Sequence, residues 1–378
     1  MKRVKLIMLL FIPVFAIGQD IDTITIITYN ILNFPGSERV TYFQQILDII
    51  DPDIVVVQEL LSQEGADIFL NQVLNDDSVE YSAAPFIDGP YTDNLIFYKH
   101  SKIIYIGTEQ IPTDLRDISA YTLSLVDKPD FEFIIYSVHL KASQGSDNEY
   151  RRYQEVLALK NHADDLPPGY HFIVLGDFNI YKSIEPAYQT LMDSFAIDLY
   201  DPINRPGYWH DNPSFADIHT QSTRDITFGG GVGGGMDDRF DMILLSEPFS
   251  TPEGLMYIEG SYYAFGNDGN HFNQAINYGS NSAVPSEIAD ALYYASDHLP
   301  VVAQFQYTTT YIVGDVNGDE EINTADLSYL SSYLVSGGPE PVPYLAGDLN
   351  GDCTVNGVDL SYLTNYLYFG GPTPTPCE

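Results

Sequence analysis

Polar side chains that can bind a cation or move a proton stand at the ends of several predicted β-strands. In HFIVLGDFNIY, residues 171–181, an apolar run ends at Gly176, and Asp177 and Asn179 follow. Side chains two apart on an extended chain point the same way, so this pair can reach one target together. Taken alone, the pair also fits a simple Asx turn. Other predicted strand ends carry similar residues: Asn30, Glu59, His139, Asp241, Asp297 and His298.

These residue types suit the hydrolysis of a phosphoester. That reaction needs charge neutralisation on the phosphoryl oxygens, an activated water and a proton for the leaving oxygen. Glu59 offers hard oxygen ligands of the kind that Mg²⁺, Mn²⁺ or Ca²⁺ prefers. His139 and His298 form the natural acid–base pair, because only histidine titrates near neutral pH without help. The pattern leaves open which histidine is the acid.

Alternating and apolar runs predict the elements that must position these residues. Strands are expected at residues 23–29, 53–57, 95–98, 103–106, 121–126, 131–138, 173–175, 242–245 and 299–307, and helices at 38–50, 66–74, 147–163 and 185–195. Strands interspersed with helices indicate a mixed α/β domain. If the polar strand ends gather on one rim, they form a single site, as is usual in open α/β sheets.

Six segments in chain order resemble the endonuclease/exonuclease/phosphatase superfamily: TYNILNF, VVVQEL, YSVHLKAS, VLGDFNIY, DDRFDMIL and SDHLPVV. That group includes pancreatic-type deoxyribonuclease, sphingomyelinases and inositol polyphosphate 5-phosphatases. The resemblance covers residues 22–307. It implies an α+β fold, a four-layer sandwich of two packed mixed β-sheets flanked by helices.

The resemblance also implies roles for the strand-end residues. Glu59 would hold the active-site Mg²⁺ (or Mn²⁺ or Ca²⁺) with support from Asn30, and Asp297 would add a carboxylate on the metal side. The residues with catalytic roles would be His139, Asp177, Asn179, Asp241 and His298. The two histidines would flank the scissile phosphate, with Asp241 orienting the second of them. Asp177 would position water or metal, and Asn179 would hold a phosphoryl oxygen.

Basic residues are few, and three of them are candidates for binding substrate phosphate. Lys141 follows His139 by two residues, and Arg151 and Arg152 stand near the start of the next predicted helix, where free N–H groups also favour anions. Arg239, two residues before Asp241, extends the predicted patch. The alternative interpretation of the helix arginines is a pair of solvated charges with i,i+4 partners.

The chain carries a net charge of −37, and such a surface repels polyanions at long range. A phosphate substrate must therefore be met by a local basic patch or by bound metal, although solubility of an exported protein also explains acidity. Pancreatic-type deoxyribonucleases carry an arginine two residues after the metal-binding glutamate, and this chain has Leu61 there. Duplex DNA is thus disfavoured as the preferred substrate, and DNA, RNA or both remain open.

The C-terminal segment contains two copies of a calcium-loop pattern, DVNGDEEINTAD and DLNGDCTVNGVD, 33 residues apart. Each opens an amphipathic helix, so the segment resembles a small all-α dockerin-type module with two Ca²⁺ and a cohesin-type scaffold as partner. The sixth loop position, usually glycine, is Glu320 or Cys353. The predicted ligands are Asp315, Asn317, Asp319, Glu321, Asn323 and Asp326 in loop 1, and Asp348, Asn350, Asp352, Thr354, Asn356 and Asp359 in loop 2.

Residues 1–18 have the basic start, short apolar run and small-residue end of a secretory signal. The domains expected after it are a catalytic domain at 19–307, a linker at 308–313 and the dockerin-like module at 314–378. We therefore expect a secreted or cell-surface protein without a stable membrane span. In an oxidising compartment the two cysteines, Cys353 and Cys377, can pair, although the sequence does not prove it.

The sequence thus predicts a secreted, divalent-metal-dependent phosphodiesterase, a nuclease acting on DNA, RNA or both, tethered through its tail. A second hypothesis keeps the site and changes the substrate to a sphingomyelin-like lipid or another phosphoester. A third, of another class, is a non-catalytic calcium-binding assembly protein.

Overall fold

The structure is a computed structural model that describes residues 16–34, 37–251 and 254–377. The predicted signal peptide lies outside the described residues except for Ala16, Ile17 and Gly18. The chain divides into two compact units. The larger unit comprises residues 23–307, and the smaller unit comprises residues 16–22 together with residues 308–377. No helix in the described part of the chain is long and apolar enough to cross a membrane.

The first sheet of the larger unit contains seven strands, in the order β11-β13-β1-β2-β4-β3 with β12 paired to β13. Their bounds are β1 Ile17–Phe34, β2 Ile54–Leu60, β3 Tyr81–Ala83, β4 Asp93–Lys99, β11 Leu255–Tyr257, β12 Tyr263–Ala264 and β13 Val301–Ile312. The central pair, β1 and β2, is parallel, while β2 and β4 are antiparallel. At the centre of this mixed sheet, residues 24–32 of β1 and 54–58 of β2 are rich in β-branched side chains and buried.

The second sheet contains six strands, in the order β5-β6-β7-β8-β10-β9. Their bounds are β5 Ile103–Ile111, β6 Ile118–Leu125, β7 Lys128–His139, β8 His171–Asp177, β9 Leu199–Tyr200 and β10 Asp241–Ser246. Strands β7 and β8 are parallel, because the helix between them carries the chain back to the starting edge.

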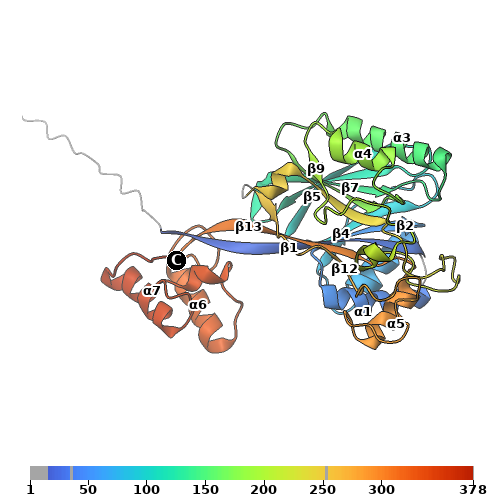
Figure 1. The fold of residues 1–378 in the computed structure, drawn as a ribbon. Coiled ribbons are helices and arrows are strands. Elements are labelled where there is room, and N and C mark those ends of the chain that lie inside the picture. The colour runs from blue at the N-terminus through green and yellow to red at the C-terminus, as the bar shows by residue number, and fades with distance from the viewer. Residues whose placement is uncertain (1–15, 35–36, 252–253, 378) are drawn as a thin grey trace, which may run out of the picture. The chain divides into compact units, whose positions relative to one another are not determined.

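The two sheets pack face to face, and helices cover their outer faces (Figure 1). The core between the sheets joins residues of both, for example Val55 and Phe97 with Ile135 and Ile243. A second core lies between the six-stranded sheet and its helices. On the first sheet the helices are α1 Val40–Ile50, α2 Gln63–Ile68 and α5 Ser286–Ala295, with a π-helical turn at Phe69–Leu74; on the second they are α3 Ser146–Ala163 and α4 Pro186–Asp193. The predicted sandwich of two mixed sheets flanked by helices is confirmed.

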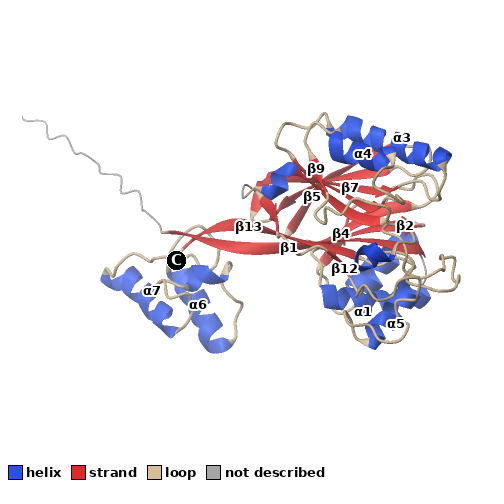
Figure 2. Cartoon of the chain, in the orientation of Figure 1, coloured by secondary structure: helices blue, strands red, loops and turns tan. Residues whose placement is uncertain are grey.

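The smaller unit holds α6 Thr324–Ser336 and α7 Gly357–Phe369, each directly after a predicted calcium loop, with a 3-10 turn at Tyr344–Gly347 between them (Figure 2). Asn323 and Asn356 cap these helices through reciprocal hydrogen bonds with Asp326 and Asp359. Leu330 and Leu363 are fully buried in a core of their own. The helical module that the repeats predict is confirmed.

The predicted linker, residues 308–313, is instead strand as far as Ile312, because β13 continues through it. Its residues alternate, with Thr309 and Tyr311 buried and Thr310 exposed, which is the period of a half-buried strand. The threonine content that suggested a linker is equally typical of a strand.

Candidate active site

Backbone pairing alone brings three of the predicted residues together. In the parallel pair β7–β8, His139 lies opposite Asp177, and in the antiparallel pair β10–β8, Asp241 lies opposite the same residue. Asp177 therefore occupies the middle of three neighbouring strand ends. On the facing sheet, Asn30 pairs with Gln58 across β1 and β2, which places Glu59 at the neighbouring strand end.

Asn30 connects the two sheets through its side-chain amide. Its Nδ2 donates to Glu59 Oε1 and to Asp177 Oδ2, each at 3.1 Å, so one amide bridges two carboxylates. Its Oδ1 accepts from the Leu32 backbone N–H at 3.0 Å, which fixes the orientation of the amide. The second Glu59 oxygen accepts from the Asn33 N–H at 2.9 Å. Glu59 and Asp177 are thereby held within one hydrogen-bonded bridge.

Both histidines face the same carboxylate. His139 Nε2 lies 3.4 Å from Asp177 Oδ2 and 3.8 Å from Glu59 Oε1, and His298 Nε2 lies 3.8 Å from Asp177 Oδ2. His298 Nδ1 pairs with Asp241 Oδ2 at 2.8 Å, as the resemblance implied for the residue that orients this ring. The structure thus brings Asn30, Glu59, His139, Asp177, Asp241 and His298 into a single buried site.

Two residues at this site adopt left-handed backbone angles that side chains rarely take. Glu59 has φ of 64° and Asn179 has φ of 51°. Such conformations cost free energy and tend to occur where function requires a particular side-chain position. Asn179 N–H donates to Asp177 Oδ1 at 3.0 Å, and its Nδ2 donates to the Leu140 carbonyl at 3.3 Å. Asn179 therefore positions Asp177 and lies beside it.

Burial and neighbouring charges separate the proton affinities of these groups. Burial raises the pKa of Asp177 to about 7, although the His298 charge lowers it. Burial lowers the pKa of His139 well below its usual value, and the charges of Arg116 and His298 lower it further. Burial alone would lower the pKa of His298. The negative charges of Asp241 and Asp177 outweigh burial, so this pKa lies well above its usual value. The site thus pairs a neutral His139 with a cationic His298.

The residues present fit a divalent cation. Glu59, Asp177, Asp241 and Asp297 bring four carboxylates into a region where burial disfavours uncompensated charge. Asp297 Oδ1 and Asp241 Oδ1 are buried with no hydrogen-bond donor in the described part of the chain. Oxygen donors of this kind suit Mg²⁺, Mn²⁺ or Ca²⁺. Glu59 and Asn30 would hold such an ion.

Asp297 has a second task beyond the one expected. Its Oδ2 accepts from the Val232 backbone N–H at 2.7 Å, so it anchors the glycine-rich loop at residues 229–235. A Cβ on Gly231 would lie 2.5 Å from Arg224 Nη1 and 3.1 Å from Asp297 Cγ, so only glycine fits there. Asp297 Oδ1 has no hydrogen-bond partner in the described part of the chain. The role of Asp297 as a carboxylate on the metal side stays a prediction.

Two of the arginines in the predicted phosphate patch are not available to a substrate. Arg152 is fully buried, pairs with Glu185 at 2.7 Å and also donates to two loop carbonyls. Arg239 is buried against Asp201, with two hydrogen bonds at 2.7 and 2.8 Å. The prediction for both is wrong, because each forms an internal ion pair that the sequence pattern does not reveal. Lys141 is partly exposed and Arg151 exposed, so both remain accessible.

Sequence analysis missed two residues at the site. Arg116, in the loop between β5 and β6, donates to the His139 carbonyl at 3.4 Å. Burial lowers the pKa of the Lys141 ammonium, and the charges of Arg151 and Arg116 lower it further. Gln221 Nε2 lies 2.6 Å from His298 Nε2. Arg116 could have been found as an isolated base among acids, whereas Gln221 is an uncharged loop residue with no sequence signal. His139 Nδ1 has no hydrogen-bond partner in the described part of the chain, so no acid orients this ring through that nitrogen.

The two tail loops share one geometry. Asp315 Oδ2 accepts from the N–H of Glu320, and Asp348 Oδ2 accepts from the N–H of Cys353, each at 2.8 Å. Glu320 and Cys353 adopt φ of 65° and 62°, the conformation for which glycine is usual at this position. In loop 1, oxygens of Asp315, Asp319 and Asp326 lie within 4.8 Å of one another, a donor set that fits Ca²⁺.

Comparison with known proteins agrees with both units. A model of the Endonuclease/Exonuclease/phosphatase family matches residues 27–298, and one of the Dockerin type I domain matches residues 313–368. The structure of D. rerio TDP2 complexed with single strand DNA product is similar, with 15% identity, a TM-score of 0.51, and coverage of 75% of this chain and 98% of that one. An endonuclease/exonuclease/phosphatase family protein from Bacteroides thetaiotaomicron has 16% identity, a TM-score of 0.50, and coverage of 77% and 97%. No curated protein matched in sequence.

Proposed function

Because this chain belongs to the endonuclease/exonuclease/phosphatase family, we propose that it is a divalent-metal-dependent phosphodiesterase that hydrolyses nucleic acid outside the cell. The observation that carries the proposal is the bridge from Asn30 to Glu59 and Asp177, with both histidines facing it. Such a set can bind a phosphodiester, polarise it and move a proton, which a purely structural cluster has no need to combine.

In the proposed reaction each residue has a distinct task. Asp177, with its pKa near 7, accepts the proton of the attacking water, because a base works best when its pKa is near the working pH. His298, held cationic by Asp241, donates a hydrogen bond to the phosphoryl oxygen as negative charge develops. A divalent ion held by Glu59 and Asn30 would neutralise phosphoryl charge when bound. His139 stays neutral and donates a hydrogen bond to the leaving oxygen, which then takes up the proton that Asp177 removed from the water.

The cations that remain accessible favour a strand of nucleic acid as substrate. Arg116 donates to the His139 carbonyl, and the charges of Arg151 and Arg116 act on Lys141, two residues after His139, so these three cations lie near the site. A row of cations beside the scissile position suits a chain of phosphates more than a single one. Leu61, two residues after Glu59, is 41% exposed and uncharged, so it offers duplex DNA no cation. Its presence therefore favours single-stranded over duplex substrates. D. rerio TDP2, which shares the fold, binds a single-stranded DNA product.

We further propose that the tail tethers the enzyme to a cohesin-type scaffold at the cell surface. The dockerin match and the paired loops support a calcium-dependent attachment. The basic and apolar start of the chain supports export.

A substrate panel tests the proposed activity. The purified protein should cleave single-stranded DNA or RNA when Mg²⁺, Mn²⁺ or Ca²⁺ is present, cleave duplex DNA more slowly, and lose all activity in EDTA. Release of acid-soluble nucleotides measures the nuclease arms, and phosphocholine release measures a sphingomyelin arm. Cleavage of sphingomyelin alone would replace nucleic acid by lipid as the substrate, and inertness on all four would defeat the proposal.

A further inference from the structure

Each calcium loop in the tail is covered by a proline-rich segment. Residues 338–343, GPEPVP, follow α6, and residues 371–376, GPTPTP, follow α7 at the same 33-residue spacing. We call these segments strap 1 and strap 2. Tyr329 in α6 donates to the Glu340 carbonyl, and Tyr362 in α7 donates to the Thr373 carbonyl, both at 3.1 Å. The straps are therefore equivalent parts of the two repeats.

Strap 2 lies closely against loop 2. The Thr375 N–H donates to the Leu349 carbonyl at 3.2 Å, and Pro374 is buried. A Cβ on Gly351 would lie only 2.9 Å from the Pro376 carbonyl oxygen, whereas in loop 1 the nearest atom to a Cβ on Gly318 is the Val342 carbonyl at 3.8 Å. Strap 2 thus packs more tightly on its loop than strap 1 does.

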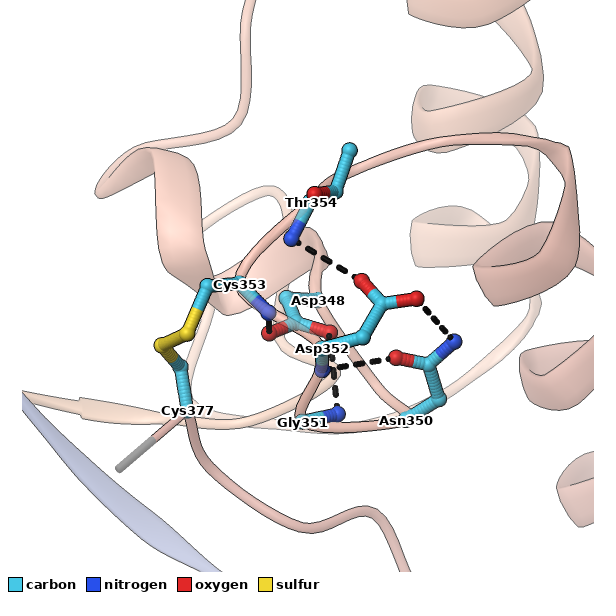
Figure 3. The surroundings of a disulfide bond; sticks show 7 residues. All are labelled: Asp348, Asn350, Gly351, Asp352, Cys353, Thr354 and Cys377. Atoms are coloured by element: carbon cyan, nitrogen blue, oxygen red, sulfur yellow. Dashed lines mark hydrogen bonds between the residues drawn. A yellow bond between two sulfur atoms is a disulfide. The ribbon is translucent and has the colours of Figure 1, made fainter.

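The two straps are anchored differently. Strap 1 runs directly into the 3-10 turn at Tyr344–Gly347, whose Ala346 is buried in the module. Cys377 directly follows strap 2 and stands at the position equivalent to Tyr344. It forms a disulfide with Cys353 (Figure 3). Cys353 is the sixth residue of loop 2, and its N–H donates to Asp348 Oδ2 at 2.8 Å. The covalent bond therefore joins the strap to the residue that orients the first predicted calcium ligand.

We propose that the Cys353–Cys377 disulfide is a working part of the second calcium site, so that loop 2 binds Ca²⁺ tightly only when the bond is formed. The bond holds strap 2 in place against Leu349 and Gly351, and the N–H groups of Gly351 and Cys353 donate to the two oxygens of Asp348 (Figure 3). A preformed loop loses less conformational entropy when it binds its ion. Loop 1 needs no such bond and binds Ca²⁺ irrespective of redox state.

The module then responds to thiol reductants. A dithiol reductant attacks the bond and becomes oxidised to a disulfide, while the two cysteine sulfurs each gain one electron and one proton. Cys353 is exposed, so a small reductant reaches it. Asp359, the last predicted ligand of loop 2, also caps α7, so the calcium site and the start of that helix share one residue. Attachment through the tail would accordingly be favoured in oxidising surroundings.

Calorimetric Ca²⁺ titration of the full chain tests this proposal without reference to enzyme activity. Asp326→Ala silences loop 1 and leaves loop 2 as the site observed, with excess Mg²⁺ occupying the catalytic site. Adding dithiothreitol, or replacing both cysteines by serine, should weaken Ca²⁺ binding at loop 2 roughly tenfold or more, because the unbridged loop loses more conformational entropy when it binds the ion. In the matched Asp359→Ala background, loop 1 should keep its affinity under both treatments.

A second pair of substitutions separates the strap from backbone strain. Cys353→Gly with Cys377→Ser removes the bond and gives the sixth position the residue that tolerates positive φ. The proposal predicts that this variant still binds Ca²⁺ weakly at loop 2. Recovery of the oxidised affinity by glycine, an unchanged affinity in the double-serine variant, or an equal loss at loop 1 would each overturn it.

Discussion

Replacing His298 with alanine should lower kcat/KM on single-stranded nucleic acid by about 10²–10³-fold, the usual loss when a donor to a developing negative charge is removed. The substitution removes a cationic ring from the site. In the parent protein, Nδ1 of this ring lies 2.8 Å from Asp241 Oδ2, and its Nε2 faces Asp177. Steady-state cleavage of a fluorogenic oligonucleotide in saturating Mg²⁺ measures the effect.

Two controls separate chemistry from folding in this experiment. His100→Ala removes an exposed histidine of the same unit and should leave the rate unchanged. His298→Asn keeps a donor for the buried Asp241, which alanine would leave without a partner at a cost of about 1–3 kcal/mol. If His298→Asn melts like the parent protein and retains full activity, His298 has no catalytic role.

Replacing Glu59 with glutamine should reduce activity by about 10³-fold, because removing a metal-side charge forfeits several kcal/mol of transition-state stabilisation. Glutamine keeps an oxygen that can accept from the Asn33 N–H, so the fold should persist. The variant should also need more Mg²⁺ for half-maximal rate. A metal titration of the cleavage rate measures both effects.

The matched control is Glu64→Gln, which removes an exposed carboxylate five residues away in the first turn of α2. It should change neither the rate nor the metal requirement. An unchanged metal requirement in Glu59→Gln would show that Glu59 does not hold the ion.

The sequence allowed prediction of the strands and of most of the site's residues because both follow from local patterns, whereas the sandwich of two sheets was implied by the resemblance to the family. Apolar β-branched runs mark the strands, and in an open sheet the residues that end them tend to meet at one edge. His139, Asp177 and Asp241 come together through strand register alone. The calcium loops could also be predicted from the sequence, because short side chains with oxygen ligands recur at the same spacing in two segments 33 residues apart.

Other features depend on tertiary partners that no local pattern encodes. Arg152 and Arg239 resemble surface cations in sequence, yet Glu185 and Asp201, both distant in the chain, take them into the interior. Strands of two or three residues, such as β9 and β12, are too short to show a period. Helix α5 begins without a side-chain cap, so its start has no sequence marker.

The central claim is that Glu59 and His298, far apart in the chain, act in one site. A double-mutant cycle on kcat/KM with Glu59→Gln, His298→Ala and the combined variant tests it most directly. Residues that act as a unit give strongly non-additive losses, so the double variant should be scarcely slower than the slower single variant. Losses that multiply, as they do for residues more than about 7–10 Å apart without shared partners, would contradict the account.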